Sequence, residues 1–143
     1  IVRAGKAKAV REALAGPRGI AVQSAGPDQY FLVAEGREEG ALHRDLKTKL
    51  AGLASVIDQS HGRVTIRIAG PMARAVLAKG TPVDVHESVF PVGQSAMTQM
   101  AHIGVHLTRT GDDSFELAVF RAFSESFWEW LTSQAAEFGY QVA

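Results

Sequence analysis

TRTGDDSFELAVF, residues 108–120, predicts a β-hairpin on which the rest of the fold depends. Residues 104–110 approach the turn with alternating and β-branched side chains, and residues 115–120 form a second β-rich run. Between them, residues 111–114 read Gly-Asp-Asp-Ser, three residue types that favour turns. Because an isolated hairpin is only marginally stable in water, it needs a cover. We expect the aromatic segment 123–138 to supply that cover as a helix.

Apolar periodicity and turn residues predict the other elements. Strands are expected at residues 18–24, 29–35, 55–59, 63–69 and 95–101, with 140–142 left open as a last edge strand. Helices are expected at residues 2–15, 37–53, 71–78 and 123–138. The strand at 95–101 should pair with 104–110, and 81–90 is interpreted as an exposed connection with some strand character. The segment 2–15 is either a weak helix or an arm, because its apolar side chains are small and sparse.

The order of these elements favours an α+β fold. Strands and helices mix without regular βαβ alternation, so the sheet is expected to be mainly antiparallel with helices packed on one face. The second half loosely repeats the first, which suggests two ferredoxin-like halves of ββαβ type. We interpret residues 1–143 as a single domain, with residues 1–16 as an optional N-terminal arm.

The composition excludes several classes of function. Lys and Arg number 15 and Asp and Glu number 15, so the basic excess of a nucleic-acid-binding protein is missing. No run of about 18 apolar residues is present, which argues against a membrane span. The absence of cysteine excludes disulfides and thiolate metal sites and fits a cytoplasmic location. No signal-peptide pattern is seen, and the start at Ile1 rather than Met leaves open whether the N-terminus is truncated.

No residue pattern in the sequence predicts catalysis, a cofactor or a metal. His102 and His106 have a spacing that suits a metal on a helix, but Gly104 and the β-rich context favour strands and ordinary histidines. Asp112 and Asp113 could form an acid pair, but a role in the hairpin turn is favoured. The motifs of nucleophile elbows, phosphate loops and dinucleotide sites are absent. We therefore assign no catalytic, cofactor-binding or metal residue to this chain.

Three residues are candidates for an interface with another protein: Trp128, Arg109 and Arg67. Both arginines lie near the ends of predicted strands, where a buried or interfacial guanidinium can bind a carboxylate bidentately and an exposed one is simply solvated. The aromatic helix has a core-facing stripe, formed by Phe123, Phe127, Trp130, Leu131 and Phe138. Trp128 lies off this stripe, and tryptophan is enriched at interface hot spots. With the zero net charge and the small apolar side chains of residues 2–15, this predicts a chain that works as a subunit.

Two motifs give the chain a family resemblance. Residues 67–77 read RIAGPMARAVL, residues 108–117 read TRTGDDSFEL, and a Phe/Trp-rich helix follows. In this order the motifs resemble the gamma subunit of heterotetrameric sarcosine oxidase, which is similar in turn to the folate-binding part of the glycine cleavage T-protein. Residues 109–111 and 115–116 match the T-protein pattern, whereas the glycine-rich segment between them is shortened here to residues 112–114.

The resemblance, which covers residues 64–139, implies a T-protein-like fold and a non-catalytic structural subunit. The complex that it implies is an oxidoreductase acting on the CH–NH group of donors. That complex demethylates sarcosine to glycine oxidatively, with hydrogen peroxide and methylenetetrahydrofolate as products. The family places FAD, FMN, NAD and the tetrahydrofolate site in the alpha and beta subunits and zinc in a delta subunit. The alpha, beta and delta subunits are therefore the expected partners.

Two alternatives stay open at this point. The first is a folate-binding or aminomethyltransferase-like protein with a reduced pocket, since the segment shortened to residues 112–114 helps to form the pterin pocket in the folate-binding relatives. The catalytic aspartate of the T-protein has no clear counterpart in the N-terminal half of this sequence. The second alternative is an unrelated α+β interaction domain.

Overall fold

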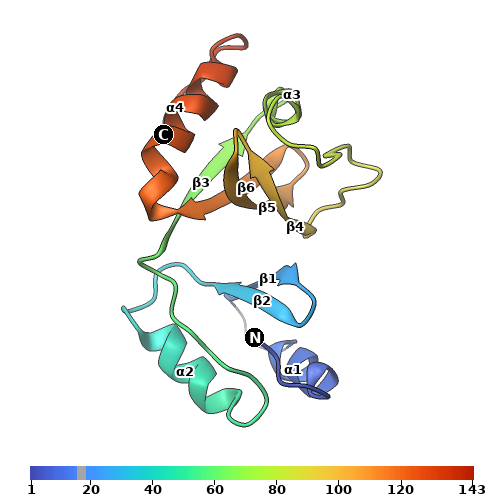
Figure 1. Cartoon of the computed structure of the whole chain (residues 1–143), viewed down its shortest axis with the longest axis vertical. Coiled ribbons are helices and arrows are strands. Elements are labelled where there is room, and N and C mark those ends of the chain that lie inside the picture. Colours follow the sequence, from blue (N-terminus) through green and yellow to red (C-terminus); the bar gives the residue numbers. More distant parts are fainter. Residues whose placement is uncertain (16–18) are drawn as a thin grey trace. The chain divides into compact units, whose positions relative to one another are not determined.

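The computed structural model describes residues 1–15 and 19–143, and the chain divides into two compact units, Ile1–Ser60 and His61–Ala143 (Figure 1). Each unit combines helices with an antiparallel sheet, so the predicted α+β class is confirmed. The expected end of the N-terminal arm at residue 16 and the expected start of the first strand at Arg18 lie outside the described residues. No helix in the described ranges has the length and apolar character needed to cross a membrane.

The described residues of the first unit form two helices and a two-stranded sheet in the order αββα. Helix α1 spans Ala7–Leu14, strands β1 and β2 span Ala21–Gly26 and Gln29–Val33, and helix α2 spans Ala41–Lys49. The two strands form the predicted N-terminal hairpin with antiparallel pairing.

Both helices of the first unit contribute side chains to one apolar core, whose buried members are Val2, Val10, Leu14, Leu46 and Leu50. In the segment expected as a helix at residues 37–53, Leu42, Leu46, Leu50 and Leu53 are spaced four, four and three residues apart, and all four pack in this core. Residues 2–15 were expected as a weak helix or an arm because their apolar side chains are small and sparse, but the segment packs in the core of its own unit. Val10 and Leu14 are four residues apart, so they share one face of α1, and both are buried. Ala7 and Ala13 of α1 also pack against this core, so several small side chains attach the short helix.

The strand predicted at residues 55–59 is wrong. Val2 forms a single antiparallel bridge with Ala54, and the described strands include no residue of this segment. The Asp58 side chain accepts hydrogen bonds from the backbone N–H and the hydroxyl of Ser60, at 2.9 and 2.6 Å. Such local bonds stabilise a turn, and they compete with the extended course that the apolar residues favour.

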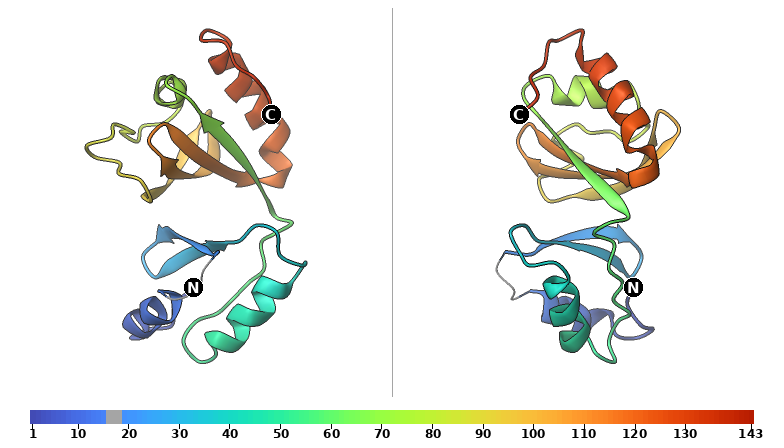
Figure 2. Two further views of the ribbon diagram at one scale, coloured as in Figure 1. Left: turned by 180° about the vertical axis from the view of Figure 1, so that it is seen from behind. Right: turned by 90° about the vertical axis from the view of Figure 1, so that its left-hand side faces the viewer.

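The second unit is built on a four-stranded sheet in the order β3-β6-β5-β4, in which all neighbouring strands are antiparallel. Its strands are β3 (Arg63–Ala69), β4 (Ser95–Met100), β5 (Ile103–Gly111) and β6 (Ser114–Phe120). Its helices are α3 (Ala73–Ala78), the 3₁₀ turn η1 (Arg121–Phe123) and α4 (Ser124–Ala135). Helices α3 and α4 pack on one face of this sheet and share a core with it (Figure 2).

The hairpin at residues 108–120 is confirmed, because β5 pairs with β6 around the predicted turn. Leu107 lies opposite Leu117, so both side chains point to the same face of the sheet. On that face they are buried in one cluster with Phe127 of the aromatic helix. The helix therefore covers the hairpin as expected, and the predicted pairing of 95–101 with 104–110 is present as β4–β5.

Two predictions at the C-terminal end are wrong. Phe123 was expected in the core-facing stripe, but it belongs to η1, and this tighter turn precedes the α-helical periodicity; its side chain is exposed. Residues 140–142 were left open as an edge strand. They belong to no described strand, and Tyr140 and Val142 are exposed, so this segment buries no apolar face against the sheet.

Candidate functional site

Arg109 is buried in the second unit, on the face of β5 that meets the helices. Its guanidinium donates three hydrogen bonds to backbone carbonyls: Nη1 to Phe90, Nε to Gly111 and Nη2 to Asp112, at 2.9, 3.0 and 3.0 Å. Burial of a charged group is costly unless its donors are satisfied, and these carbonyls satisfy them. Arg109 therefore ties the hairpin turn to the loop that contains Phe90.

Arg74 reaches the same turn from helix α3. Its Nε donates to the carbonyl of Val85 at 3.2 Å, and its two terminal nitrogens bind the Asp113 carboxylate and the Asp112 carbonyl. Arg74 and Arg109, termed the arginine pair below, thus share the Asp112 carbonyl. Sequence reasoning missed Arg74, although the residue lies in the quoted motif 67–77, because its partners are distant in sequence.

Arg67 lies at the other edge of the hairpin, opposite Glu116 in the β3–β6 pairing. Its Nη2 is 2.8 Å from the Glu116 carboxylate, and 57% of the Arg67 side chain is exposed. An ion pair this accessible contributes about 0.2–1 kcal/mol to stability, because water and salt screen it. Arg67 consequently keeps much of its surface open to solvent while its charge is paired within the chain.

Trp128 lies on α4 and is 40% exposed, whereas Phe127 next to it is fully buried. The structure thus places Trp128 off the core-facing stripe, as its position on the helical wheel predicts. The three candidate interface residues lie on three different elements. Arg109 is buried on β5, whereas Arg67 on β3 and Trp128 on α4 are exposed.

An aromatic–cation pair, formed by the half-buried Arg63 and the exposed Phe120, lies at the start of β3. The Arg63 guanidinium carbon is 4.1 Å from the centre of the Phe120 ring, and the two residues are register partners between β3 and β6. Burial lowers the pKa of the Arg63 guanidinium from its usual value, because water is removed from around the charge. The ring face supplies part of the stabilisation that water would otherwise give.

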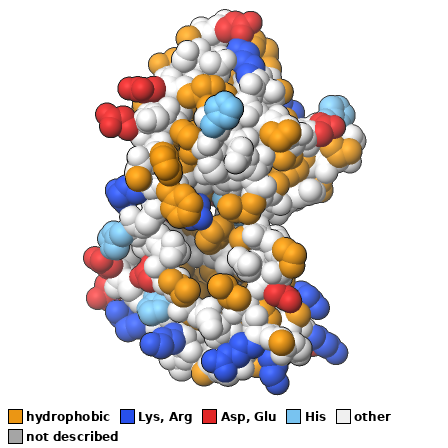
Figure 3. Space-filling view, in the orientation of Figure 1, with side chains coloured by type: hydrophobic (Ala, Val, Ile, Leu, Met, Phe, Trp, Pro, Cys, Tyr) orange, Lys and Arg blue, Asp and Glu red, His pale blue; other side chains and the backbone are white. Residues whose placement is uncertain are grey.

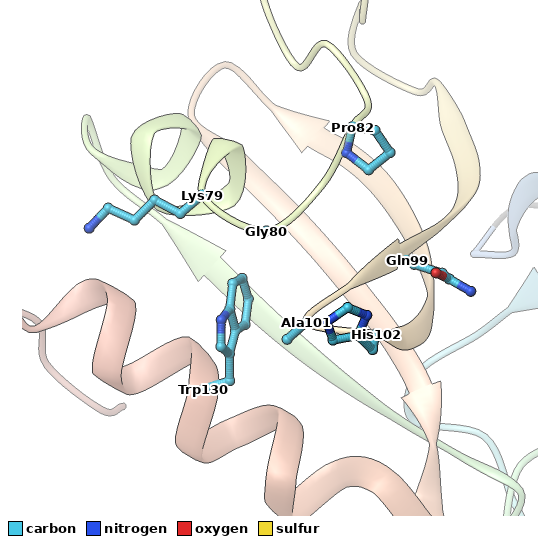
Figure 4. Close-up of a pocket in the computed structure, with 7 residues that line it drawn as sticks. All are labelled: Lys79, Gly80, Pro82, Gln99, Ala101, His102 and Trp130. Atoms are coloured by element: carbon cyan, nitrogen blue, oxygen red, sulfur yellow. The ribbon is translucent and has the colours of Figure 1, made fainter.

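A pocket of about 350 Å³ lies between the end of α3, helix α4 and the β4–β5 turn (Figure 4). Its lining residues are Lys79, Gly80, Pro82, Gln99, Ala101, His102 and Trp130. Figure 4 shows the indole of Trp130 standing between the Gly80 backbone and the β4–β5 turn, and the Lys79 side chain directed away. The Lys79 ammonium instead binds the Glu137 carboxylate and, at 3.0 Å, the Gln134 carbonyl.

Gly80 has a second role that its position at a helix end does not reveal. A Cβ atom at this position would overlap the six-membered ring of Trp130. Glycine is therefore required for the close packing of this indole on the backbone, in addition to ending α3. The aromatic wall of the pocket depends on this contact.

His102 is the one histidine among the residues that line the pocket, and no carboxylate lines it to orient the imidazole. His102 lies in the β4–β5 turn with a φ of 66°, and His106 lies on β5, so the spacing that suits a helical metal site is not realised. Within residues 1–15 and 19–143, no group of three His, Asp or Glu side chains could hold a metal ion.

Comparison with known proteins places the chain in a family. Residues 5–137 match the family described as "Sarcosine oxidase, gamma subunit family". The sarcosine oxidase subunit gamma of Corynebacterium sp. strain U-96 is 36% identical over 135 residues, which is 94% of this chain and 65% of the relative. That of an Arthrobacter sp. is 34% identical over 135 residues, 94% of this chain and 66% of the relative.

A solved structure agrees with these relatives. A chain of the heterotetrameric sarcosine oxidase from Corynebacterium sp. U-96, in complex with pyrrole 2-carboxylate, is 35% identical to this chain with a TM-score of 0.77. The similarity covers 87% of this chain and 64% of that one. The chain thus spans about two thirds of the length of the relatives that it matches. On the strength of both the sequence and the fold, the chain belongs to the sarcosine oxidase gamma subunit family.

Proposed function

We propose that this chain is a structural subunit of a heterotetrameric sarcosine oxidase and carries no active site of its own. The observation that carries the proposal is the similarity, at 35% identity and a TM-score of 0.77, to a chain of a solved heterotetrameric sarcosine oxidase. The pocket supports the proposal that the chain carries no active site, because the one histidine that lines it has no carboxylate beside it to form an acid–base pair.

The reaction proposed for the whole complex is the oxidative demethylation of sarcosine to glycine, with hydrogen peroxide and methylenetetrahydrofolate as products. The alpha, beta and delta subunits are the proposed partners, and FAD, FMN, NAD, tetrahydrofolate and zinc are proposed to reside in them. A cytoplasmic location is proposed with them. The named relatives are oxidase gamma subunits, so they give no support to the alternative of a free-standing folate-binding or aminomethyltransferase-like protein.

We also propose that the scaffold is related to the folate-binding part of the T-protein. The described first unit, in the order αββα, does not have the ββαβ order expected of a ferredoxin-like half. The support is local: the Arg-Thr-Gly and Phe-Glu motifs face each other across the β5–β6 turn, with Arg109 opposite Phe115. In this chain the short turn between them is filled by the arginine pair and its carbonyl partners. This arrangement supports a scaffold role for the motif in place of a pterin pocket.

The proposed interface with the partner subunits includes Trp128 and Arg67, supported by Arg109 from within. Trp128 offers a large, partly exposed aromatic surface, and Arg67 offers an exposed guanidinium next to Glu116. Aromatic and arginine side chains dominate the energetics of many protein interfaces. Arg109 contributes indirectly, because it holds the hairpin from which Glu116 projects.

The test is to co-express the chain with the alpha, beta and delta subunits of its own organism and to measure sarcosine-dependent hydrogen peroxide formation. We expect the chain to co-purify in constant proportion with the other three and the yield of active complex to fall when its gene is omitted. A complex that forms fully and is equally active without the chain would contradict the proposal. The isolated chain serves as the control and should show no activity.

A further inference from the structure

The segment between α3 and β4, residues 79–94, is an ordered loop without a helix or strand of its own. It projects from the second unit in the views of Figures 1 and 2. Loops longer than about 12–15 residues without secondary structure are uncommon in compact domains, and those that are ordered usually carry a function. The sequence pattern indicates an exposed connection here, so the fixed conformation of the loop needs an explanation.

Buried contacts hold the loop in one conformation. Val85 and Phe90 are buried in the core of the second unit, and the carbonyl of each accepts a hydrogen bond from the arginine pair. Near its end, the Gly93 N–H donates to the Arg109 carbonyl at 2.8 Å, and the Arg109 N–H donates to the Gln94 carbonyl at 3.0 Å. A loop fixed in this way loses little conformational entropy when it binds a partner.

The same contacts turn two valines and several carboxylates outward. Val89 and Val92, on either side of the buried Phe90, are 52% and 54% exposed. Asp84 and Glu87 on the loop are exposed, and the Asp112 side chain in the neighbouring turn is fully exposed. Figure 3 shows acidic, histidine and hydrophobic side chains side by side on this projection. The Arg109 guanidinium is buried, and the Arg74 side chain, 23% exposed, is paired with Asp113. Asp84 and Glu87 therefore give the exposed valine surface an acidic border.

We propose that residues 84–92 dock into a partner subunit of the oxidase, at an apolar recess bordered by lysine or arginine side chains. The inference rests on the proposed function, since it names the surface by which this chain joins the complex. Charge complementarity indicates the basic character of the partner, because an acidic border favours a basic surface across an interface and disfavours an acidic surface. The two exposed valines supply the desolvated centre, and the fixed loop keeps them in place.

The experiment compares the affinity of variant chains for a co-expressed complex of the alpha, beta and delta subunits. Val89→Ser/Val92→Ser removes the apolar centre, and Ile57→Ser/Val142→Ser is its matched control, because these residues are 65% and 66% exposed elsewhere. We expect the loop variant to raise Kd at least tenfold and the control to change it less than twofold. Thermal melts of both should match the wild type, since the substituted side chains are exposed.

A charge variant gives an independent readout. Glu87→Lys should weaken binding and reduce its dependence on salt, whereas Glu38→Lys, an exposed glutamate of the first unit, should do neither. Wild-type binding with an unchanged Kd for both loop variants would overturn the docking inference and leave the proposed function standing. Failure of the wild-type chain to bind would overturn the proposed function itself. If the loop variants instead abolish self-association of the isolated chain, residues 84–92 bind a second copy of this chain and the proposal is wrong.

Discussion

Arg109→Met tests whether the buried guanidinium fixes the hairpin and the loop. Methionine keeps the apolar stem of the side chain in the core but removes all three donors to the Phe90, Gly111 and Asp112 carbonyls. The turn carbonyls regain water, and Asp112 keeps Arg74 as a donor. The carbonyl of Phe90 is buried and is left without this donor.

The loss of unfolding free energy in Arg109→Met can be estimated from these three carbonyls. An orphaned buried carbonyl costs about 1–3 kcal/mol, and the two rehydrated ones add about 1 kcal/mol together. Removal of the buried charge returns part of this cost. We expect the free energy of unfolding to fall by about 2–3 kcal/mol, which corresponds to a decrease in Tm of roughly 4–12 °C for a chain of this size.

Urea denaturation and amide hydrogen exchange measure the two consequences separately. The free energy of unfolding should fall, and exchange should accelerate at residues 79–94 and at the Gly93 amide in particular, while α2 keeps its protection. Arg121→Met is the matched control, because Arg121 donates through Nε to one exposed carbonyl, that of His61, at 2.7 Å. A loss for Arg109→Met no larger than for Arg121→Met, or below about 0.5 kcal/mol, would refute the reasoning.

Other substitutions test the packing and the interface. Gly80→Ala should destabilise by about 1–3 kcal/mol because the new methyl group overlaps Trp130, whereas Gly104→Ala, with open space at its Cβ, should be neutral or stabilising; thermal melts compare the two. Phe127→Ala should cost about 3–5 kcal/mol of unfolding free energy in urea titrations, and an unchanged midpoint would place its ring outside the core. Trp128→Ala should weaken assembly with the other subunits by more than about 1 kcal/mol while leaving the circular dichroism spectrum intact. The isolated chain should bind no flavin, which a visible absorbance band surviving gel filtration would contradict.

Local patterns in the sequence were sufficient for the hairpin and its helical cover. The Gly-Asp-Asp-Ser turn and the spacing of Phe127 and Leu131 each encode one element, and both are present in the structure. The apolar pattern gave a wrong prediction where a local side-chain hydrogen bond competes with strand formation. The apolar residues at 55–59 favour a strand, but the Asp58 side chain bonds Ser60 and turns the chain.

The contacts that join the hairpin to the loop before β4 connect residues that are distant in sequence, which is why the sequence did not reveal them. Arg109 and Arg74 reach the carbonyls of Phe90 and Val85, and a backbone carbonyl has no signature in the identity of its residue. Arg109 was therefore expected either to bind a carboxylate or to be solvated. The structure shows three hydrogen bonds to backbone carbonyls beside a 3.8 Å ion pair with the Asp112 carboxylate. The role of Gly80 depends likewise on Trp130, which arrives from another helix.

Native mass spectrometry of the co-expressed alpha, beta and delta subunits, with and without this chain, shows whether the chain is a subunit of their complex. We expect one assembly whose mass exceeds that of the other three subunits by one copy of the 15.3 kDa chain. We also expect that Val89→Ser/Val92→Ser depletes this species and that Ile57→Ser/Val142→Ser does not. A spectrum in which the chain appears only as a free monomer beside a complete assembly of the other subunits would contradict the account.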